Sequence, residues 1–148
     1  MSTPNQTPFE TTLHVRDHCL CLAAQRAARA LARRFDEAFR PLGITSGQYS
    51  LLMALNRPEP PQIGAVASVL AMDRTTLTAN LKPLERKGFV QSAANPRDRR
   101  SRLLKLTSDG QALLAQAADI WFREHAKVDD EIGHATGDTL RDGLARLA

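Results

Sequence analysis

The chain has 148 residues, enough for one domain or for one domain with extensions that pair two copies. Hydrophobic residues make up 43% and charged residues 24%, which is typical of a globular protein. No apolar run approaches the roughly 18 residues of a membrane span, and the first residues lack the pattern of a secretory signal. We therefore expect a cytoplasmic protein with no membrane partner.

The net charge of +4 is unevenly distributed along the chain. Residues 73–105 carry nine Lys/Arg against three Asp/Glu, a net charge of +6. Residues 106–148 carry four Lys/Arg against eight Asp/Glu, a net charge of −4. A basic centre followed by an acidic end is typical of a module that binds a polyanion.

The first part of the chain predicts a flexible terminus and a long helix. Residues 1–12 are polar and contain two prolines, so we expect them to be flexible. Apolar residues then recur every three or four positions from about Asp17, and Pro41 and Gly43 end the pattern. We assign residues 13–42 to an N-terminal dimerisation helix.

Two short helices joined by a tight turn are predicted after a further helix, which Thr45 or Ser46 caps. The first short helix starts near Ile63, and the second opens at Asp73, a good N-cap, and closes at Gly88. This pair predicts a helix-turn-helix. The polar residues of its second helix suit DNA bases and phosphates and are Arg74, Thr75, Thr76, Thr78 and Lys82.

A basic hairpin is predicted directly after the helix-turn-helix. One strand begins at Phe89, the other holds Leu103, Leu104 and Leu106, and Asn95-Pro96 marks the turn. The charged residues of the intervening segment, expected at the hairpin tip, are Arg97, Asp98, Arg99, Arg100 and Arg102. A basic loop is usually only solvated, but a basic hairpin in this position is typical of a wing that reaches the minor groove.

The last part of the chain predicts two helices. The first starts at Thr107 or Ser108 and runs to about Lys127, and the second follows Asp129-Asp130. The two ends of the chain carry more apolar surface than a winged module of roughly 70 residues needs, so we expect a homodimer built from both ends. We assign residues 45–106 to a winged helix-turn-helix lobe and residues 107–148 to C-terminal dimerisation helices, a mainly α fold with a small β-hairpin.

Several of these segments resemble the MarR family of winged-helix regulators, named for multiple antibiotic resistance. The similar segments are PLGITSGQYSLLMAL, DRTTLTANLKPLERKGFV and NPRDRRSRLLKLTSDGQALL. The resemblance covers roughly residues 13–147 and implies a dimer whose two recognition helices enter successive major grooves of a near-palindromic site, normally repressing transcription. It also implies that Asp98 braces the wing and that Arg100 enters the minor groove.

Cys19 and Cys21 raise the question of a thiol switch. One branch of the family senses organic hydroperoxides through a cysteine near the start of its first helix, and Cys21 has a similar spacing to Gly43. That branch holds its thiolate with tyrosines four and fourteen residues after the cysteine, where this chain has Gln25 and Phe35. A buried, inert cysteine is therefore the simpler interpretation of Cys21, and the sequence does not decide which of the two cysteines is redox-active.

No cofactor or metal site is expected. Cys19 and Cys21 point roughly 200° apart on a helix, so they cannot both join His14 and His18 on one face. The sequence also contains no Gly-rich phosphate loop and no nucleophile elbow, so we do not expect an enzyme.

The leading hypothesis is a sequence-specific DNA-binding regulator, a dimeric repressor of a palindromic operator that a small-molecule effector releases. The candidate residues of an effector pocket are Arg26, Phe35, Tyr49 and Trp121. Two alternatives stay open: an oxidant sensor that uses Cys21, and an architectural protein that binds DNA with low sequence specificity.

Overall fold

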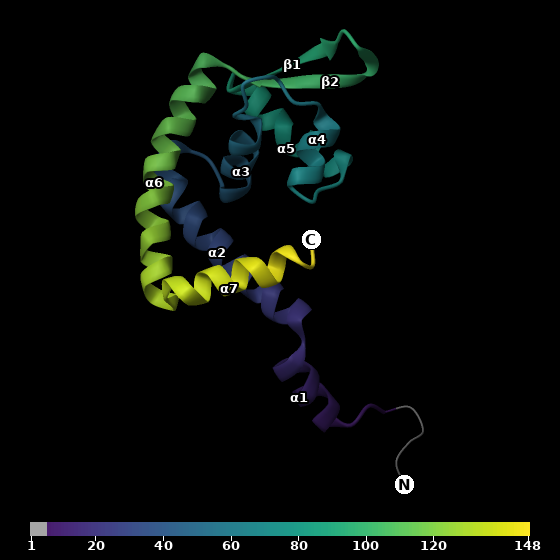
Figure 1. The fold of residues 1–148 in the computed structure, drawn as a ribbon, viewed down its shortest axis with the longest axis vertical. Coiled ribbons are helices and arrows are strands. Elements are labelled where there is room, and N and C mark those ends of the chain that lie inside the picture. The colour runs from purple at the N-terminus through teal and green to yellow at the C-terminus, as the bar shows by residue number, and fades with distance from the viewer. Residues whose placement is uncertain (1–5) are drawn as a thin grey trace. The chain divides into compact units, whose positions relative to one another are not determined.

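The computed structural model describes residues 6–148 and divides them into two units, residues up to Arg34 and residues Phe35–Ala148, which we treat separately (Figure 1). The elements in chain order are α1 (Phe9–His18), α2 (Leu20–Phe39), the 3-10 turn η1 (Arg40–Leu42), α3 (Ser46–Leu55), α4 (Ile63–Val69), α5 (Arg74–Arg86), β1 (Val90–Asn95), β2 (Asp98–Leu106), α6 (Ser108–Ile132) and α7 (His134–Ala145). The described chain is thus mainly helical with one small hairpin, as predicted.

The N-terminal helix begins earlier than predicted and is broken once. α1 starts at Phe9, four residues before the assigned start at residue 13, and ends at His18; Cys19 follows with an extended φ of −80° and ψ of 108°. Pro8 precedes the first turn and Glu10 lies within it, and both favour a helix start at this point. Of the segment expected to be flexible, residues 9–12 are helical, whereas residues 1–5 lie outside the described part.

The end of α2 and the start of α3 confirm the predicted boundaries. Gly43 adopts a φ of 69° after η1, a conformation that glycine tolerates best. Thr45 then caps α3, because its hydroxyl accepts the Gln48 N–H while the Gln48 side chain accepts the Thr45 N–H. These two local signals fix the direction of α3.

The helix-turn-helix forms as predicted, with α4 followed by α5. The turn passes through Ala71 at a φ of 50°, an unusual value for a residue with a side chain. α5 buries Leu77, Leu81 and Leu84, and it continues to Arg86 through a half-buried Pro83. Its end is a Schellman motif, in which Phe89 N–H donates to Leu84 O and Gly88 N–H donates to Glu85 O.

The two strands form an antiparallel hairpin with an irregular tip. Val90 pairs with Leu106 and Ala94 with Arg102, but Asn95 pairs with Asp98, so the register shifts between Ala94 and Asn95. The prediction placed the basic residues at the tip, whereas only Arg97 lies in the turn and the other three arginines belong to β2. Gln62 forms an isolated bridge with Leu103, which joins the segment before α4 to the hairpin.

The two C-terminal helices meet at Gly133 rather than at Asp129-Asp130. α6 is 25 residues long and includes both aspartates, and Gly133 then adopts a φ of 86°. The acidic pair does not end the helix because Asp129 and Asp130 lie opposite His125 and His134 in (i, i+4) pairs. A residue with a side chain would be strained at Gly133, so the break falls there.

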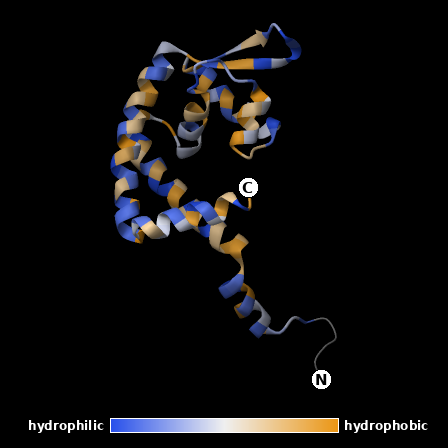
Figure 2. Cartoon of the chain, viewed as in Figure 1, coloured by the Kyte–Doolittle hydropathy of each residue, from blue (hydrophilic) through white to orange (hydrophobic). Residues whose placement is uncertain are grey.

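The hydrophobic core lies within residues 35–128. Its fully buried large side chains are Phe39, Leu51, Leu52, Val66, Leu77, Leu84 and Leu104. Figure 1 shows the hairpin projecting from the group formed by α3, α4 and α5, with α6 along one side of that group. Figure 2 shows apolar and polar residues alternating along α6, as expected for a helix with one buried face.

Candidate nucleic-acid interface

The start of α5 is fixed by Asp73, as the sequence predicted. The Thr76 backbone N–H donates to Asp73 Oδ1 at 2.8 Å, and the Thr76 hydroxyl donates to Asp73 Oδ2 at 2.7 Å. These two hydrogen bonds hold the pKa of the Asp73 carboxyl below its ordinary value, and the bond from the backbone N–H has the larger effect. The Thr76 hydroxyl is therefore engaged in the cap, although Thr76 is a candidate DNA-contacting residue.

The other four candidates on α5 lie together on its exposed face. Their side chains surround a hollow of about 370 Å³, whose lining residues are Arg74, Thr75, Thr78, Ala79 and Lys82. The opposite face of α5 packs into the core through three leucines. The buried face of α5 thus fixes the helix in the lobe, and its cationic and hydroxyl groups lie on the exposed face.

The hairpin is braced by two side chains at its tip. Asn95 is only 4% exposed, and its Oδ1 accepts the Arg97 N–H at 3.0 Å. Asp98 Oδ1 accepts the Arg100 N–H, also at 3.0 Å. The acidic residue thus binds the backbone at the start of β2, while the Arg99 and Arg100 side chains stay exposed. Figure 2 shows the tip as a strongly hydrophilic segment.

Arg102 has a different environment from the other wing arginines. Its Nε and Nη2 both donate to Ser92 Oγ on β1, at 3.2 Å and 2.9 Å. The guanidinium therefore spans the two strands of the hairpin, and it still has N–H groups left for an anion.

A second hollow lies between α3, α4 and α6, with a volume of about 520 Å³. Its lining is mostly apolar and aromatic, and the residues are Tyr49, Ser50, Met53, Ala54, Asn56, Arg57, Val69, Leu70, Ala118, Trp121 and Phe122. Burial raises the pKa of the Tyr49 phenol above its ordinary value. The structure thus brings Tyr49 and Trp121 together, two of the four residues proposed for an effector pocket.

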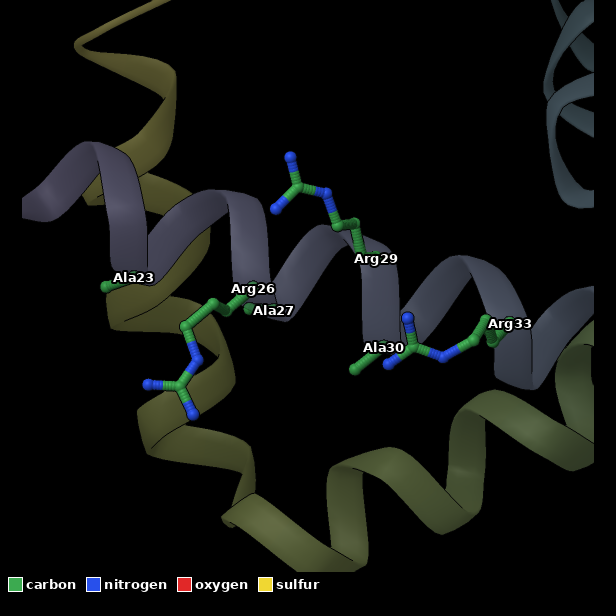
Figure 3. Close-up of a pocket in the computed structure, with 6 residues that line it drawn as sticks. All are labelled: Ala23, Arg26, Ala27, Arg29, Ala30 and Arg33. Atoms are coloured by element: carbon green, nitrogen blue, oxygen red, sulfur yellow. The ribbon is translucent and has the colours of Figure 1, made fainter.

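The other two candidate pocket residues lie elsewhere. Phe35 is a core residue that packs near Phe39 and His125, with ring centroids 6.0 Å and 6.3 Å away. Arg26 belongs to the N-terminal unit, where a surface hollow runs along α2 between Ala23, Arg26, Ala27, Arg29, Ala30 and Arg33 (Figure 3). All six residues come from one helix, which supplies no opposite wall, so we place no ligand there.

The sequence missed several residues of the second hollow. Met53, Val69 and Phe122 are large apolar side chains that are 45%, 61% and 67% exposed. In the sequence, each residue is indistinguishable from an ordinary core position of its helix. Only the structure, in which all three are exposed around one hollow, identifies them as pocket residues. Arg57 was also missed, and its Nε donates to Ala54 O at 3.2 Å.

The two cysteines are both accessible to some degree, which corrects the expectation of a buried Cys21. Cys21 is exposed, and the Gln25 Nε2 donates to its Sγ at 3.3 Å. Cys19 is half-buried at the break between α1 and α2, and the Leu22 N–H donates to its Sγ. Gln25 occupies the position where the peroxide-sensing branch has a tyrosine, and it supplies a hydrogen-bond donor there.

His14 and His18 lie beside each other in α1. His14 and His18 stack with ring centroids 4.1 Å apart, and His18 Nδ1 lies 2.8 Å from the His14 carbonyl oxygen. Within residues 6–148 we find no group of three or more His, Cys, Asp and Glu side chains placed to bind a metal ion.

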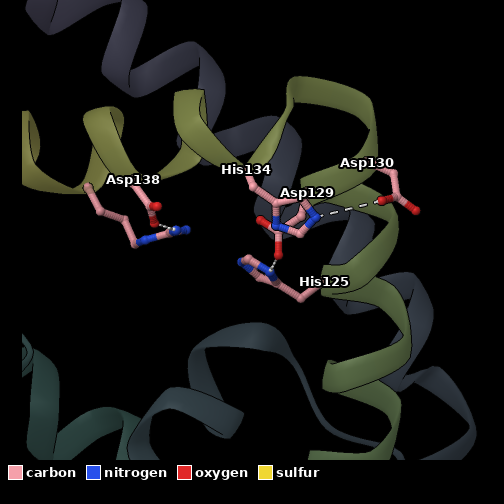
Figure 4. A network of polar contacts seen from close by, with 6 residues as sticks. His125, Asp129, Asp130, His134 and Asp138 are labelled. Carbon is pink, nitrogen blue, oxygen red and sulfur yellow. Dashed lines mark hydrogen bonds and ion pairs between the residues drawn. The ribbon is translucent and has the colours of Figure 1, made fainter.

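A polar network links the end of α6 to α7 through His134 Nε2, which lies 4.0 Å from Asp130 Oδ1 (Figure 4). His125 Nδ1 lies 3.2 Å from Asp129 Oδ2, and the His125 ring stacks on Trp121 with centroids 4.6 Å apart. Asp129 Oδ1 is buried without a hydrogen-bond partner in the described chain. On α7, Arg141 pairs with Asp138 at 2.6 Å.

These features define a winged helix-turn-helix protein with an exposed cationic helix and a cationic hairpin on one lobe. Comparison with known proteins agrees. The MarR family model matches residues 44–101. The organic hydroperoxide resistance transcriptional regulator of Bacillus subtilis is 32% identical over 101 residues, which cover 68% of this chain and 69% of that protein.

Solved structures extend the similarity to nearly the whole chain. The transcriptional regulator MosR of M. tuberculosis, in complex with DNA, is 33% identical with a TM-score of 0.79, covering 88% of this chain and 93% of that one. A mutant of E. coli MarR bound to operator DNA is 26% identical with a TM-score of 0.81, covering 91% and 97%. This chain belongs to the MarR family and is a DNA-binding transcriptional regulator, whose relatives are regulators and not enzymes.

The described residues also bear on membrane association. None of the helices within residues 6–148 combines the length and the apolar character that a membrane span requires.

Proposed function

We propose that this regulator is a dimeric repressor that binds a palindromic operator and releases it when a small molecule occupies the hollow between α3, α4 and α6. The observation that carries the proposal is the placement of the exposed α5 face and the arginine-rich hairpin on one lobe. A helix in the major groove and a cationic wing in the minor groove require these two surfaces together.

Each surface has a separate role in this proposal. Arg74, Thr75, Thr78 and Lys82 contact base edges and provide sequence specificity. The wing arginines bind phosphates and the narrow minor groove, where the negative potential is strongest. Asp98 acts indirectly, because its bond to the Arg100 N–H shapes the start of β2, which presents Arg100.

Exposed apolar side chains at both ends of the chain support the dimer. In the N-terminal unit, Phe9 and Leu20 are 68% and 72% exposed. At the other end, Leu140 and Leu144 of α7 are each 51% exposed, and Leu147, just after α7, is 73% exposed. The three leucines are three or four residues apart, which is the spacing of one helix face. Side chains of this size in contiguous rows are typical of protein–protein contacts.

The apolar hollow supports the effector. Its volume of about 520 Å³ suits a small organic molecule, and its aromatic walls come from Tyr49, Trp121 and Phe122. The hollow touches α3 and α4 of the DNA-binding lobe as well as α6. An occupant that binds one arrangement of these helices better than another shifts the population toward dimers that fit DNA poorly.

The proposal is tested by selecting the operator with the protein itself. The purified chain is used to enrich binding duplexes from a pool of random 30-base-pair DNA, and the enriched sequences are determined. We expect an inverted repeat with half-sites about one helical turn apart. Enrichment of no sequence would instead support an architectural protein of low specificity and contradict the repressor.

The wing is tested on the selected duplex by titration of fluorescence anisotropy at several salt concentrations. Arg100→Ala should weaken binding and reduce the slope of log K against log[salt] by about 0.9, since one phosphate-region charge is lost. Arg146→Ala removes the same charge from the acidic end of the chain and serves as the control, with an unchanged slope expected. Equal slopes for both variants would contradict the wing assignment.

A thiol-based switch is the second candidate, because Cys21 is exposed with a hydrogen-bond donor at its sulfur and the B. subtilis relative is named for organic hydroperoxide resistance. In such a switch the Cys21 thiolate takes one oxygen atom from the hydroperoxide and becomes a sulfenic acid, while the hydroperoxide leaves as an alcohol. Treatment with cumene hydroperoxide should then abolish binding of the wild type and of Cys19→Ser but not of Cys21→Ser. Binding that ignores the peroxide in all three proteins would exclude the switch.

A further inference from the structure

The first helix of the helix-turn-helix has a glycine at a point of close contact with Arg74. A Cβ atom built on Gly64 would lie 2.7 Å from Arg74 Nη2, 3.6 Å from Cζ and 3.7 Å from Nε. Three guanidinium atoms of Arg74 therefore lie next to the space that a side chain at position 64 would fill. A Cβ atom essentially never approaches another heavy atom to 2.7 Å, so any larger residue would displace this group.

No backbone requirement explains Gly64. Among the described glycines, positive φ values occur at Gly43, Gly88 and Gly133 but not at Gly64. Glycine within a helix is also less favourable than alanine, because it loses more backbone entropy on folding. The three atoms nearest to a Cβ atom at this position all belong to Arg74, so the close approach of Arg74 is the structural reason for a glycine here.

Arg74 is an exposed side chain whose stem has four rotatable bonds. Neither a hydrogen bond nor an ion pair holds its guanidinium in the described chain, so its N–H groups remain available to an anion or a base edge. Because Gly64 has no side chain, the guanidinium can occupy this position beside α4 and next to the hollow on α5. A side chain that is ordered before binding loses less conformational entropy when the complex forms.

We infer that Gly64 is a positioning residue for DNA binding, which acts by leaving space for Arg74 to lie across α4 in the orientation that meets DNA. This inference rests on the proposed role of Arg74 as a DNA contact. It adds a residue of the supporting helix, outside the recognition helix and the wing, to the determinants of affinity.

A double-mutant cycle on the operator duplex selected above tests the inference. The proteins are the wild type, Gly64→Ala, Arg74→Ala and the double variant. Gly47→Ala in α3 is the matched control, because the nearest atom to its Cβ position is Thr45 Oγ1 at an ordinary contact distance of 3.9 Å. We expect Gly64→Ala to weaken binding about three- to tenfold, the range that the ordering of one flexible side chain covers. Arg74→Ala should weaken binding by about tenfold or more, and the double variant should be no weaker than Arg74→Ala alone.

Thermal unfolding of the free proteins separates positioning from folding. Gly64→Ala should keep or raise the Tm, because alanine favours the helix and the far end of Arg74 can move at little cost. The salt dependence of binding by Gly64→Ala should change in the same direction as that of Arg74→Ala. A lowered Tm that accounts for the weaker binding would overturn the inference.

The remaining outcomes are also distinct. Weaker binding by Arg74→Ala with wild-type binding by Gly64→Ala would overturn the role of Gly64 and leave the proposed function intact. Additive losses in the double variant would show that Gly64 acts independently of Arg74 and would also overturn it. Wild-type binding by both single variants would remove Arg74 from the interface, and the inference would fail with that assignment even though the operator is bound.

Discussion

The DNA-binding lobe and the terminal helices use their apolar residues in opposite ways. α3 and α1 both have ten residues, yet α3 buries five of them and α1 buries none. α7 has twelve residues and buries only Gly137. The lobe therefore packs into one core together with α6 and the end of α2, whereas α1 and α7 keep large apolar side chains exposed. This difference supports the proposed division between a tightly packed DNA-binding module and a pairing surface.

The strongest test of this contrast is a matched pair of leucine truncations. Leu52 is fully buried and Leu147 is 73% exposed. Leu52→Ala should lower the free energy of unfolding by about 3–4 kcal/mol, because it leaves a cavity in the core. Leu147→Ala should change it by no more than about 0.5 kcal/mol in dilute solution.

Urea denaturation at two protein concentrations sharpens the result. The loss caused by Leu52→Ala should not depend on concentration, whereas any loss caused by Leu147→Ala should grow with it if the residue acts through a dimer. A large, concentration-independent loss for Leu147→Ala would mean that the terminal helix is part of the same core.

The junction between lobe and α6 should be almost as sensitive as the core. A Cβ atom on Gly110 would lie 2.1 Å from the Phe89 carbonyl oxygen, and neither backbone segment can move freely. The Thr107 hydroxyl donates to Gly88 O at 2.6 Å, and the Thr107 N–H donates to Phe89 O at 3.1 Å. These two hydrogen bonds hold the start of α6 against the end of the α5–β1 connection. Gly110→Ala should therefore destabilise the protein by about 2–3 kcal/mol, as overpacking does.

Gly143→Ala is the control for that measurement, because its added methyl group meets no atom within 4 Å. It should leave stability unchanged or raise it by up to about 1 kcal/mol through helix propensity. Equal losses in calorimetry for the two variants would contradict the close contact at Gly110.

The proposed pairing surface should be disrupted by one charge. Leu144→Asp places a carboxylate within the exposed apolar row of α7, where a partner would have to bury it. Light scattering should then report a monomer, with the helix content and the fold of the lobe unchanged. Thr136→Asp adds the same charge to the first turn of α7 without removing apolar surface, so it should remain a dimer. A dimer in both variants would place the interface elsewhere.

Local chemistry explains how much of this structure the sequence could predict. Thr45, Asp73 and Thr107 each cap a helix through a hydroxyl or carboxylate and a backbone N–H three residues later. Such signals depend on neighbours in the chain, so these boundaries were predictable. The leucines of α5 and the polar residues opposite them follow the same helical period, which also made the recognition face predictable.

The features that the sequence did not predict depend on contacts between distant residues or on the absence of a strong local signal. The break at Cys19 has neither glycine nor proline, and the turn at Ala71 adopts a positive φ without glycine. The hollow beside Trp121 is assembled from α3, α4 and α6, so no single segment reveals it. The contact between Gly64 and Arg74 joins two helices and is likewise invisible in either one.

The smallest expected effect is a dependence on acid of the stability that the Asp73 cap gives to α5; α1 and α7 have no side-chain N-cap bond of this kind. The pKa of Asp73 is lowered in the folded protein, chiefly by the Thr76 N–H, from an ordinary value of 3.8. A carboxyl with a depressed folded pKa contributes stability above its unfolded pKa and loses it as the pH falls through the folded pKa. The contribution of this cap should thus be complete above about pH 4 and should decline below 3.8.

The variant Asp73→Asn tests this dependence, because it keeps an oxygen that can accept the Thr76 N–H but does not titrate. As the pH falls through this range, the free energy of unfolding measured in urea should decrease more for the wild type than for the variant. Parallel pH curves for the two proteins would show that the Asp73 cap is not what makes the recognition helix sensitive to acid.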